Sequence, residues 1–78
     1  MRLLIAEDDR ALRDTLVRGL REEAYAVDGV SDGDAAFLRA VSEPYDAIVL
    51  DVLLPRRDGR SVCRALRDRG VLTPALLL

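Results

Sequence analysis

The sequence predicts an α/β fold, a doubly wound sheet of parallel strands with helices on both faces. Two observations predict it. Apolar runs of four residues without polar alternation, Leu3–Ala6 and Ala47–Leu50, are typical of strands that are buried on both faces. Amphipathic segments with helical spacing lie between the apolar runs, and this alternation indicates βαβ units. Right-handed crossovers between parallel strands then place helices on both faces of the sheet.

The first strand is expected at Arg2–Ala6, and the first helix is expected from Arg10 to about Glu23. Asp9 stands immediately before this helix, where an aspartate side chain can accept a hydrogen bond from the first turn. The helix carries one apolar stripe with a spacing of three to four residues. The residues of the stripe are Leu12, Leu16, Val17 and Leu20.

The segment Tyr25–Val30 predicts a weaker second strand, with Tyr25 and Val27 pointing inward. Ser31–Asp34 interrupts this strand and opens a second helix that runs to about Val41. The expected core contacts of the second helix are Ala36, Phe37 and Ala40.

The third strand is expected at Ala47–Leu50, and a third helix is expected from about Arg60 to Arg69. Gly70 is a suitable residue to end this helix. A fourth strand begins at Ala75 and includes Leu78. The inward residues of the third helix are Val62 and Leu66.

Composition limits the possible functions. With 78 residues, half of them apolar and a third charged, the chain forms at most one small globular domain. A formal net charge of −2 gives no electrostatic case for nucleic-acid binding by these residues. All 12 basic residues are arginines, and histidine, the commonest general base and metal ligand, is absent. No signal peptide or membrane span is visible, so we expect a cytoplasmic protein without membrane contact.

The sequence stops inside an apolar strand, Ala75–Leu78, which would leave an open edge and no polar residue to meet water. We therefore expect residues 1–78 to be the N-terminal part of a longer domain.

Two acidic clusters end the two apolar runs: Glu7 and Asp8 follow the first, and Asp51 follows the third strand. In parallel sheets, ligands bind beyond the carboxyl ends of the strands, so these three side chains are expected to meet there. Carboxylate oxygens with water suit Mg²⁺ better than Zn²⁺. The alternative is that the acids are a helix cap and solvated loop residues.

The pattern of an apolar run, Glu7-Asp8-Asp9, a second apolar run, Asp51, Leu54-Pro55 and Asp58-Gly59 resembles the receiver domain of two-component response regulators. Asp32-Gly33 followed by Ala35-Ala36 is similar to the start of that family's second helix. The resemblance covers the whole chain. It implies a flavodoxin-like fold with strand order 2-1-3-4-5, of which strands 1–4 and helices 1–3 are present.

The resemblance also implies the roles of individual residues. Asp51 resembles the phosphoacceptor, which takes a phosphoryl group from a sensor histidine kinase. Asp8 resembles the direct Mg²⁺ ligand and Glu7 the acid that holds the metal through water, while Asp51 and the backbone carbonyl of Leu53 complete the metal site. Pro55 and Gly59 resemble the residues that shape the loop, with Gly59 at a position that disfavours a side chain. Asp9 remains a helix cap.

The departures from the family pattern concern the other half of its site. The family has Thr or Ser at the end of the fourth strand and Lys at the end of the fifth, and neither falls within these residues. Ala24 stands where a glycine commonly ends the first helix, which implies some strain. Arg56-Arg57 could steer an anionic donor or could be a solvated pair of loop residues.

The resemblance implies a signalling domain rather than a turnover enzyme. The start of the chain, Met1–Asp8, resembles the winged-helix branch of transcription regulators, which implies a homodimeric full-length protein that binds DNA through a further C-terminal domain. Two alternatives stay open. One is a receiver-like interaction module that is not phosphorylated. The other is a Mg²⁺-dependent aspartyl-phosphate phosphohydrolase, which would need an acid where Leu53 stands.

Overall fold

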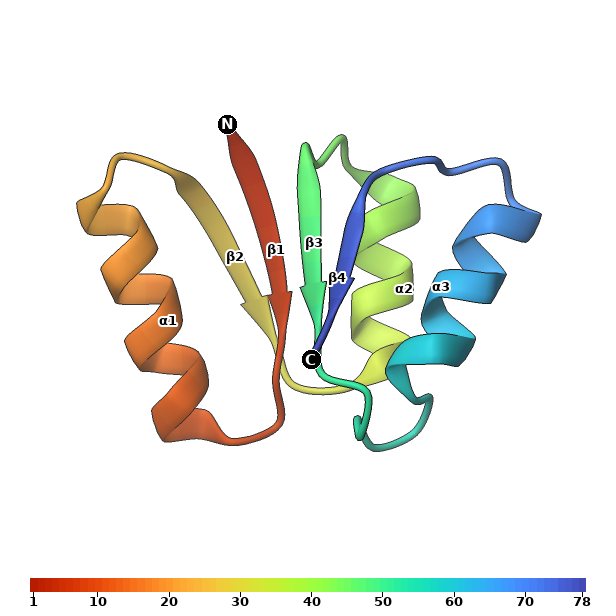
Figure 1. Cartoon of the computed structure of the whole chain (residues 1–78), viewed down its shortest axis with the longest axis horizontal. Coiled ribbons are helices and arrows are strands. Elements are labelled where there is room, and N and C mark those ends of the chain that lie inside the picture. Colours follow the sequence, from red (N-terminus) through yellow and green to blue (C-terminus); the bar gives the residue numbers. More distant parts are fainter.

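A computed structural model, which describes all 78 residues, shows a four-stranded parallel sheet in the order β2-β1-β3-β4 (Figure 1). The elements are β1 (Arg2–Ala6), α1 (Arg10–Glu22), β2 (Ala26–Val30), α2 (Gly33–Ser42), β3 (Ala47–Leu50), α3 (Gly59–Asp68) and β4 (Ala75–Leu77). The predicted fold class and the order of the first four strands are confirmed.

The strand register brings the carboxyl ends of the central strands together. Ala6, the last residue of β1, is paired with Val30 at the end of β2 and with Leu50 at the end of β3. Because all strands run in the same direction, the residues that follow each of them meet at one edge of the sheet (Figure 1).

The helices lie on both faces of the sheet, with α1 on one side and α2 and α3 on the other (Figure 1). The buried core lies between the sheet and the α2/α3 layer. Its members are Leu4, Ala6, Ala36, Ala40, Tyr45, Ile48, Leu50, Leu54, Val62 and Leu66. The sequence predicted the inward positions of α2 and α3, although Phe37 packs at the border of the cluster and is only partly buried.

The apolar stripe of α1 is only half-buried, and no residue of this helix is fully buried. Leu12 is 46% exposed, while Val17 approaches the sheet at Gly29, where an added Cβ would lie 3.0 Å from its side chain. The sequence identified the stripe but not how little of it the fold covers.

Tyr25 does not point inward, and this prediction was wrong. The residue precedes β2, which begins at Ala26, and it is 37% exposed. The reason is the turn before it: Ala24 has a φ of 69°, in the left-handed region. A glycine adopts this conformation without steric cost, so the turn is strained, as the resemblance implied.

Aspartates cap all three helices. The side chain of Asp9 accepts a hydrogen bond from the Leu12 N–H, and Asp32 and Asp58 cap α2 and α3 in the same way. Because Asp58 is the cap, α3 begins at Gly59, one residue earlier than predicted. Gly70, with a φ of 75°, follows the end of α3 as expected.

A charged network lies on the α2/α3 face, where β2 carries Asp28. The Asp28 carboxylate accepts a hydrogen bond from the Tyr45 hydroxyl at 2.6 Å and is paired with Arg2 at 3.3 Å and Arg39 at 3.5 Å. The Tyr45 hydrogen bond and the two arginines hold the pKa of Asp28 below its usual value against the opposing effect of desolvation. Arg2 also pairs with Glu43, and its guanidinium lies 5.0 Å from the centre of the Tyr45 ring.

None of the three helices has the length and the apolar character that crossing a bilayer requires.

Candidate functional site at the carboxyl ends of the strands

The acidic residues occupy the edge of the sheet that the register predicts. Glu7 and Asp8 directly follow β1, and Asp51 directly follows β3. Backbone hydrogen bonds continue the ladder past the strand ends, because the Glu7 N–H donates to Val30 at 3.0 Å and the Asp51 N–H donates to Ala6 at 3.1 Å. These bonds position the backbones of Glu7 and Asp51 side by side.

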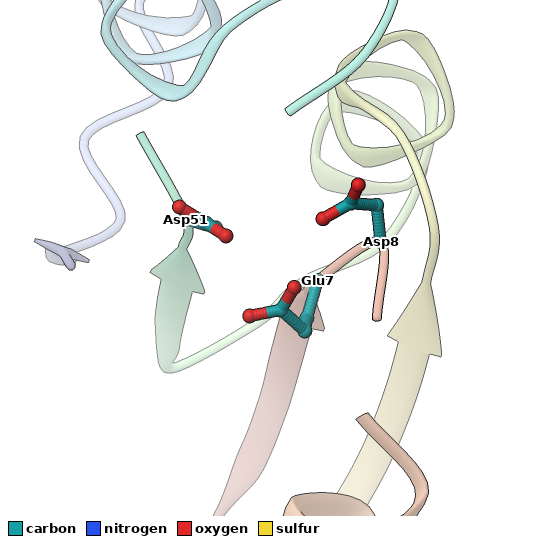
Figure 2. A group of neighbouring side chains, drawn as sticks. All are labelled: Glu7, Asp8 and Asp51. Atoms are coloured by element: carbon teal, nitrogen blue, oxygen red, sulfur yellow. The ribbon is translucent and has the colours of Figure 1, made fainter. Parts of the chain in front are cut away.

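The three carboxylates gather around one point. One oxygen of each of Glu7, Asp8 and Asp51 lies within 4.8 Å of the others, and the side chains point toward one another (Figure 2). Glu7 is buried, Asp51 is half-buried and Asp8 is exposed, so the cluster opens to solvent on one side. No ion pair in the structure includes any of the three.

Glu7 shows the electrostatic cost of this arrangement. The Asp9 N–H donates a hydrogen bond to the Glu7 carboxylate at 3.0 Å, which lowers the pKa of Glu7. Burial and the neighbouring carboxyl groups of Asp8 and Asp51 outweigh it, so the pKa of Glu7 is raised from its usual value. The site therefore holds clustered negative charge, and the nearby Arg13 guanidinium donates to the Glu7 backbone carbonyl at 2.8 Å rather than to a carboxylate.

The carboxylate of Asp51 is held by its own loop. The Leu53 N–H donates to Asp51 Oδ1 at 3.0 Å, while the Leu53 side chain is 82% exposed and leaves the carboxylate accessible. The loop then folds back on itself, because the Gly59 N–H donates to the Val52 carbonyl at 2.9 Å. A Cβ at Gly59 would lie 2.5 Å from the Asp51 carbonyl oxygen, so only glycine fits there.

The donor set fits a hard divalent cation. Several carboxylate oxygens from two strand ends, open to solvent on one side, match the ligand type and partial hydration that Mg²⁺ requires. The absence of thiolate and imidazole at the cluster makes it a poor zinc site.

Both loop arginines are paired with acidic side chains, although the Arg56 side chain is 70% exposed. Arg56 pairs with Asp32 at 3.5 Å, and Arg57 pairs with Asp34 at 3.2 Å, so both are linked to the start of α2. Neither of the two interpretations of these arginines anticipated the pairs. The sequence offered one indication of these pairs: Asp32 and Asp34 occur in the same order along the chain as their partners Arg56 and Arg57.

Residues 3–78 match the family model of the response regulator receiver domain. The chain belongs to this family. This chain thus shows three features of a receiver domain: parallel strands, acids at the ends of β1 and β3, and an aspartate-glycine pair at the start of α3.

Curated relatives are similar along the whole receiver chain. It is 50% identical over 78 residues to the response regulator protein PmrA of Pseudomonas aeruginosa and spans 35% of that protein. The chain thus spans about a third of the length of the curated relatives it matches.

Solved structures support the fold of the receiver chain. The receiver domain of the Francisella response regulator 1452 superimposes with a TM-score of 0.94 at 28% identity, over 97% of this chain and 63% of that one. The response regulator TrrA of Thermotoga maritima, solved in complex with Mg(2+)-BeF, superimposes with a TM-score of 0.84 at 29% identity, over 97% of this chain and 64% of that one.

Proposed function

We propose that Asp51 is the phosphoacceptor of this receiver domain and takes a phosphoryl group from a sensor histidine kinase in a Mg²⁺-dependent reaction. The observation that carries the proposal is the convergence of Glu7, Asp8 and Asp51, whose oxygens lie within 4.8 Å of one another at one edge of the sheet. A solvated surface would separate such charges, because their repulsion raises the free energy of the ionised cluster.

The metal would be held by Asp8 and Asp51 directly, by Glu7 through water and by the backbone carbonyl of Leu53. Bound there, Mg²⁺ supplies positive charge that offsets the negative charge of the phosphoryl oxygens. The TrrA structure, in complex with Mg(2+)-BeF, supports a magnesium site in a relative of the same fold.

The chain's own groups orient the acceptor. The Leu53 N–H fixes one oxygen of Asp51 and so sets the direction of the carboxylate. An Asp51 oxygen forms the new bond to phosphorus while the nitrogen–phosphorus bond of the donor phosphohistidine breaks, and the leaving imidazole takes up a proton from solvent. Pro55 and Gly59 shape the loop that keeps this carboxylate in place.

In the intact protein, residues 1–78 would form the N-terminal part of the receiver domain, followed by its remaining strands with the Thr or Ser and the Lys of the family. The resemblance to the winged-helix branch of the family, together with the similarity to the response regulator PmrA, of which this chain spans 35%, supports an effector that regulates transcription, with DNA bound by a C-terminal winged-helix domain and with the full-length protein as a homodimer. Such a protein acts in the cytoplasm as a signalling protein rather than a turnover enzyme.

The test is phosphorylation of the intact protein by acetyl phosphate and by a cognate kinase, with and without Mg²⁺. We expect one acyl phosphate per chain, visible by mass spectrometry and lost in Asp51→Asn. Asp9→Asn is the matched control, because asparagine also caps helices and Asp9 lies outside the cluster. Absence of labelling would favour the unphosphorylated interaction module, and labelling that persists in Asp51→Asn would place the acceptor elsewhere.

A further inference from the structure

The loop after Asp51 contains a strained turn. Arg56 has a φ of 68°, and the Arg57 N–H donates to the Pro55 carbonyl at 2.8 Å, which closes a three-residue γ-turn. γ-Turns with a positive φ are rare because they are strained. Such a conformation persists only when the surrounding structure holds it.

The start of α2 is the structure that holds the turn. The Gly33 N–H donates to the same Pro55 carbonyl at 3.1 Å. A Cβ at Gly33 would lie 1.7 Å from the carbonyl oxygen of Arg57, so the two backbones are in direct contact. No side chain fits between them unless either α2 or the loop moves.

Side chains reinforce this backbone contact. Asp32 and Asp34 pair with Arg56 and Arg57, and the Arg57 guanidinium lies 4.8 Å from the centre of the Phe37 ring. These pairs are partly exposed and each contributes little free energy. Together they set the direction in which both arginines leave the turn.

The far end of the loop is tied to the acceptor itself. Gly59 packs against the Asp51 carbonyl and donates its N–H to Val52, while Leu53 donates to the Asp51 carboxylate. A displacement at Arg57 can therefore be transmitted to Asp51 through these contacts at Gly59, Val52 and Leu53.

We propose that Gly33 is a positioning residue of the acceptor site. Because Gly33 has no side chain, the start of α2 can pack directly against the Pro55–Arg57 turn and hold it, and this contact sets the orientation of Asp51 and of the Leu53 carbonyl. The inference deepens the proposed function and rests on it for its activity readout. Gly33 touches neither the cluster nor the donor and acts only through the loop.

The experiment compares Gly33→Ala with Gly19→Ala in the intact protein. Gly19 lies on α1 with no atom within 4 Å of its added Cβ, so it is a matched control for the same substitution. Since small displacements of reacting groups have large effects on rates, we expect Gly33→Ala to slow labelling by acetyl phosphate at saturating Mg²⁺ by about tenfold or more. Mg²⁺ affinity, measured calorimetrically, should weaken as well, whereas Gly19→Ala should match the wild type.

A second readout needs neither metal nor donor. Hydrogen exchange of the metal-free protein should show faster exchange of the Arg57 amide in Gly33→Ala, with unchanged protection of β1 and β3. If Gly33 had only a structural role, Gly33→Ala would lower the overall stability, but the Arg57 amide would not exchange faster and the folded protein would be labelled at the wild-type rate. A folded Gly33→Ala protein with wild-type labelling, Mg²⁺ affinity and Arg57 protection would overturn the inference.

If Gly33→Ala does not fold, charge reversal supplies the test. Each reversal replaces the ion pair with two like charges that repel each other, so Asp34→Arg and Arg57→Asp should each slow labelling several-fold, and the double variant should recover most of the loss. Wild-type rates in both single variants, or no recovery in the double variant, would contradict the inference. If the wild type is not labelled at all, the proposed function fails, and hydrogen exchange of the Arg57 amide in Gly33→Ala and Asp34→Arg still decides whether α2 holds the loop.

Discussion

The two faces of the sheet differ in how completely they are covered. On the α2/α3 face, Ala36, Val62 and Leu66 are fully buried in a single apolar cluster. On the opposite face, α1 lies over β1 and β2 and has no buried residue, and Leu76 of β4 is 59% exposed. Within residues 1–78, one helix lies on this face of the sheet and two helices lie on the other (Figure 1).

The difference in burial indicates which layer contributes most of the free energy of folding of these residues. Burial of apolar surface is the main favourable term in folding, so the α2/α3 layer contributes most of it. The loop that follows Asp51 and its backbone contact with Gly33 lie on this well-packed side.

The largest expected effect comes from making the same leucine-to-alanine substitution on each face of the sheet. Leu66→Ala, in the fully buried position, should lower the free energy of unfolding by about 3 kcal/mol. Leu12→Ala, at a position 46% exposed, should lower it by less than about 1 kcal/mol. Urea unfolding of both variants in the intact protein measures the contrast, and equal losses would show that α1 is as well buried as α3.

A smaller effect is expected from the charged network on the α2/α3 face. Tyr45→Phe removes the hydroxyl that donates to Asp28, which should lower the free energy of unfolding by about 1–2 kcal/mol at pH 7. The pKa of Asp28 is depressed in the folded protein, so its stabilising contribution is present above the unfolded value of 3.8 and is lost as pH falls through the folded pKa.

The difference in free energy of unfolding between the wild type and Tyr45→Phe should therefore narrow as pH falls below 3.8. Without the Tyr45 hydroxyl the pKa of Asp28 is lowered less, so the variant loses less stability when Asp28 is protonated. Unfolding curves at several pH values between 2 and 7 measure this, with the solvent-facing Tyr25→Phe as the matched control. A constant difference across the range would mean that the hydroxyl acts through something other than Asp28.

The smallest effect is expected at the turn from α1 to β2. Ala24 adopts a φ of 69°, and Ala24→Gly should raise the free energy of unfolding by about 0.5–1 kcal/mol, the relief of left-handed strain less the added entropy of the unfolded chain. Thermal unfolding of the variant beside Ala26→Gly, a strand position expected to be destabilised instead, measures the effect. Destabilisation by both would show that the turn is not strained.

Much of the fold followed from local patterns. The alternation of apolar runs and amphipathic segments located seven elements to within about two residues, and the acids after Ala6 and Leu50 located the candidate site. The strand order and the residue roles came from the resemblance of spaced motifs. The pattern misjudged Tyr25, because it could not show that β2 begins after a left-handed turn.

The order of the elements, the apolar faces and the set of acids could therefore be predicted from the amino-acid sequence, since these depend on residues close together in the chain. Four features required the folded arrangement: α1 is only half-covered, Asp28 meets Tyr45, the pKa of Glu7 is raised, and Gly33 lies against the loop that follows Asp51. Each of these depends on distances between segments far apart in sequence. Periodicity places a residue on a face, but packing alone determines what that face meets.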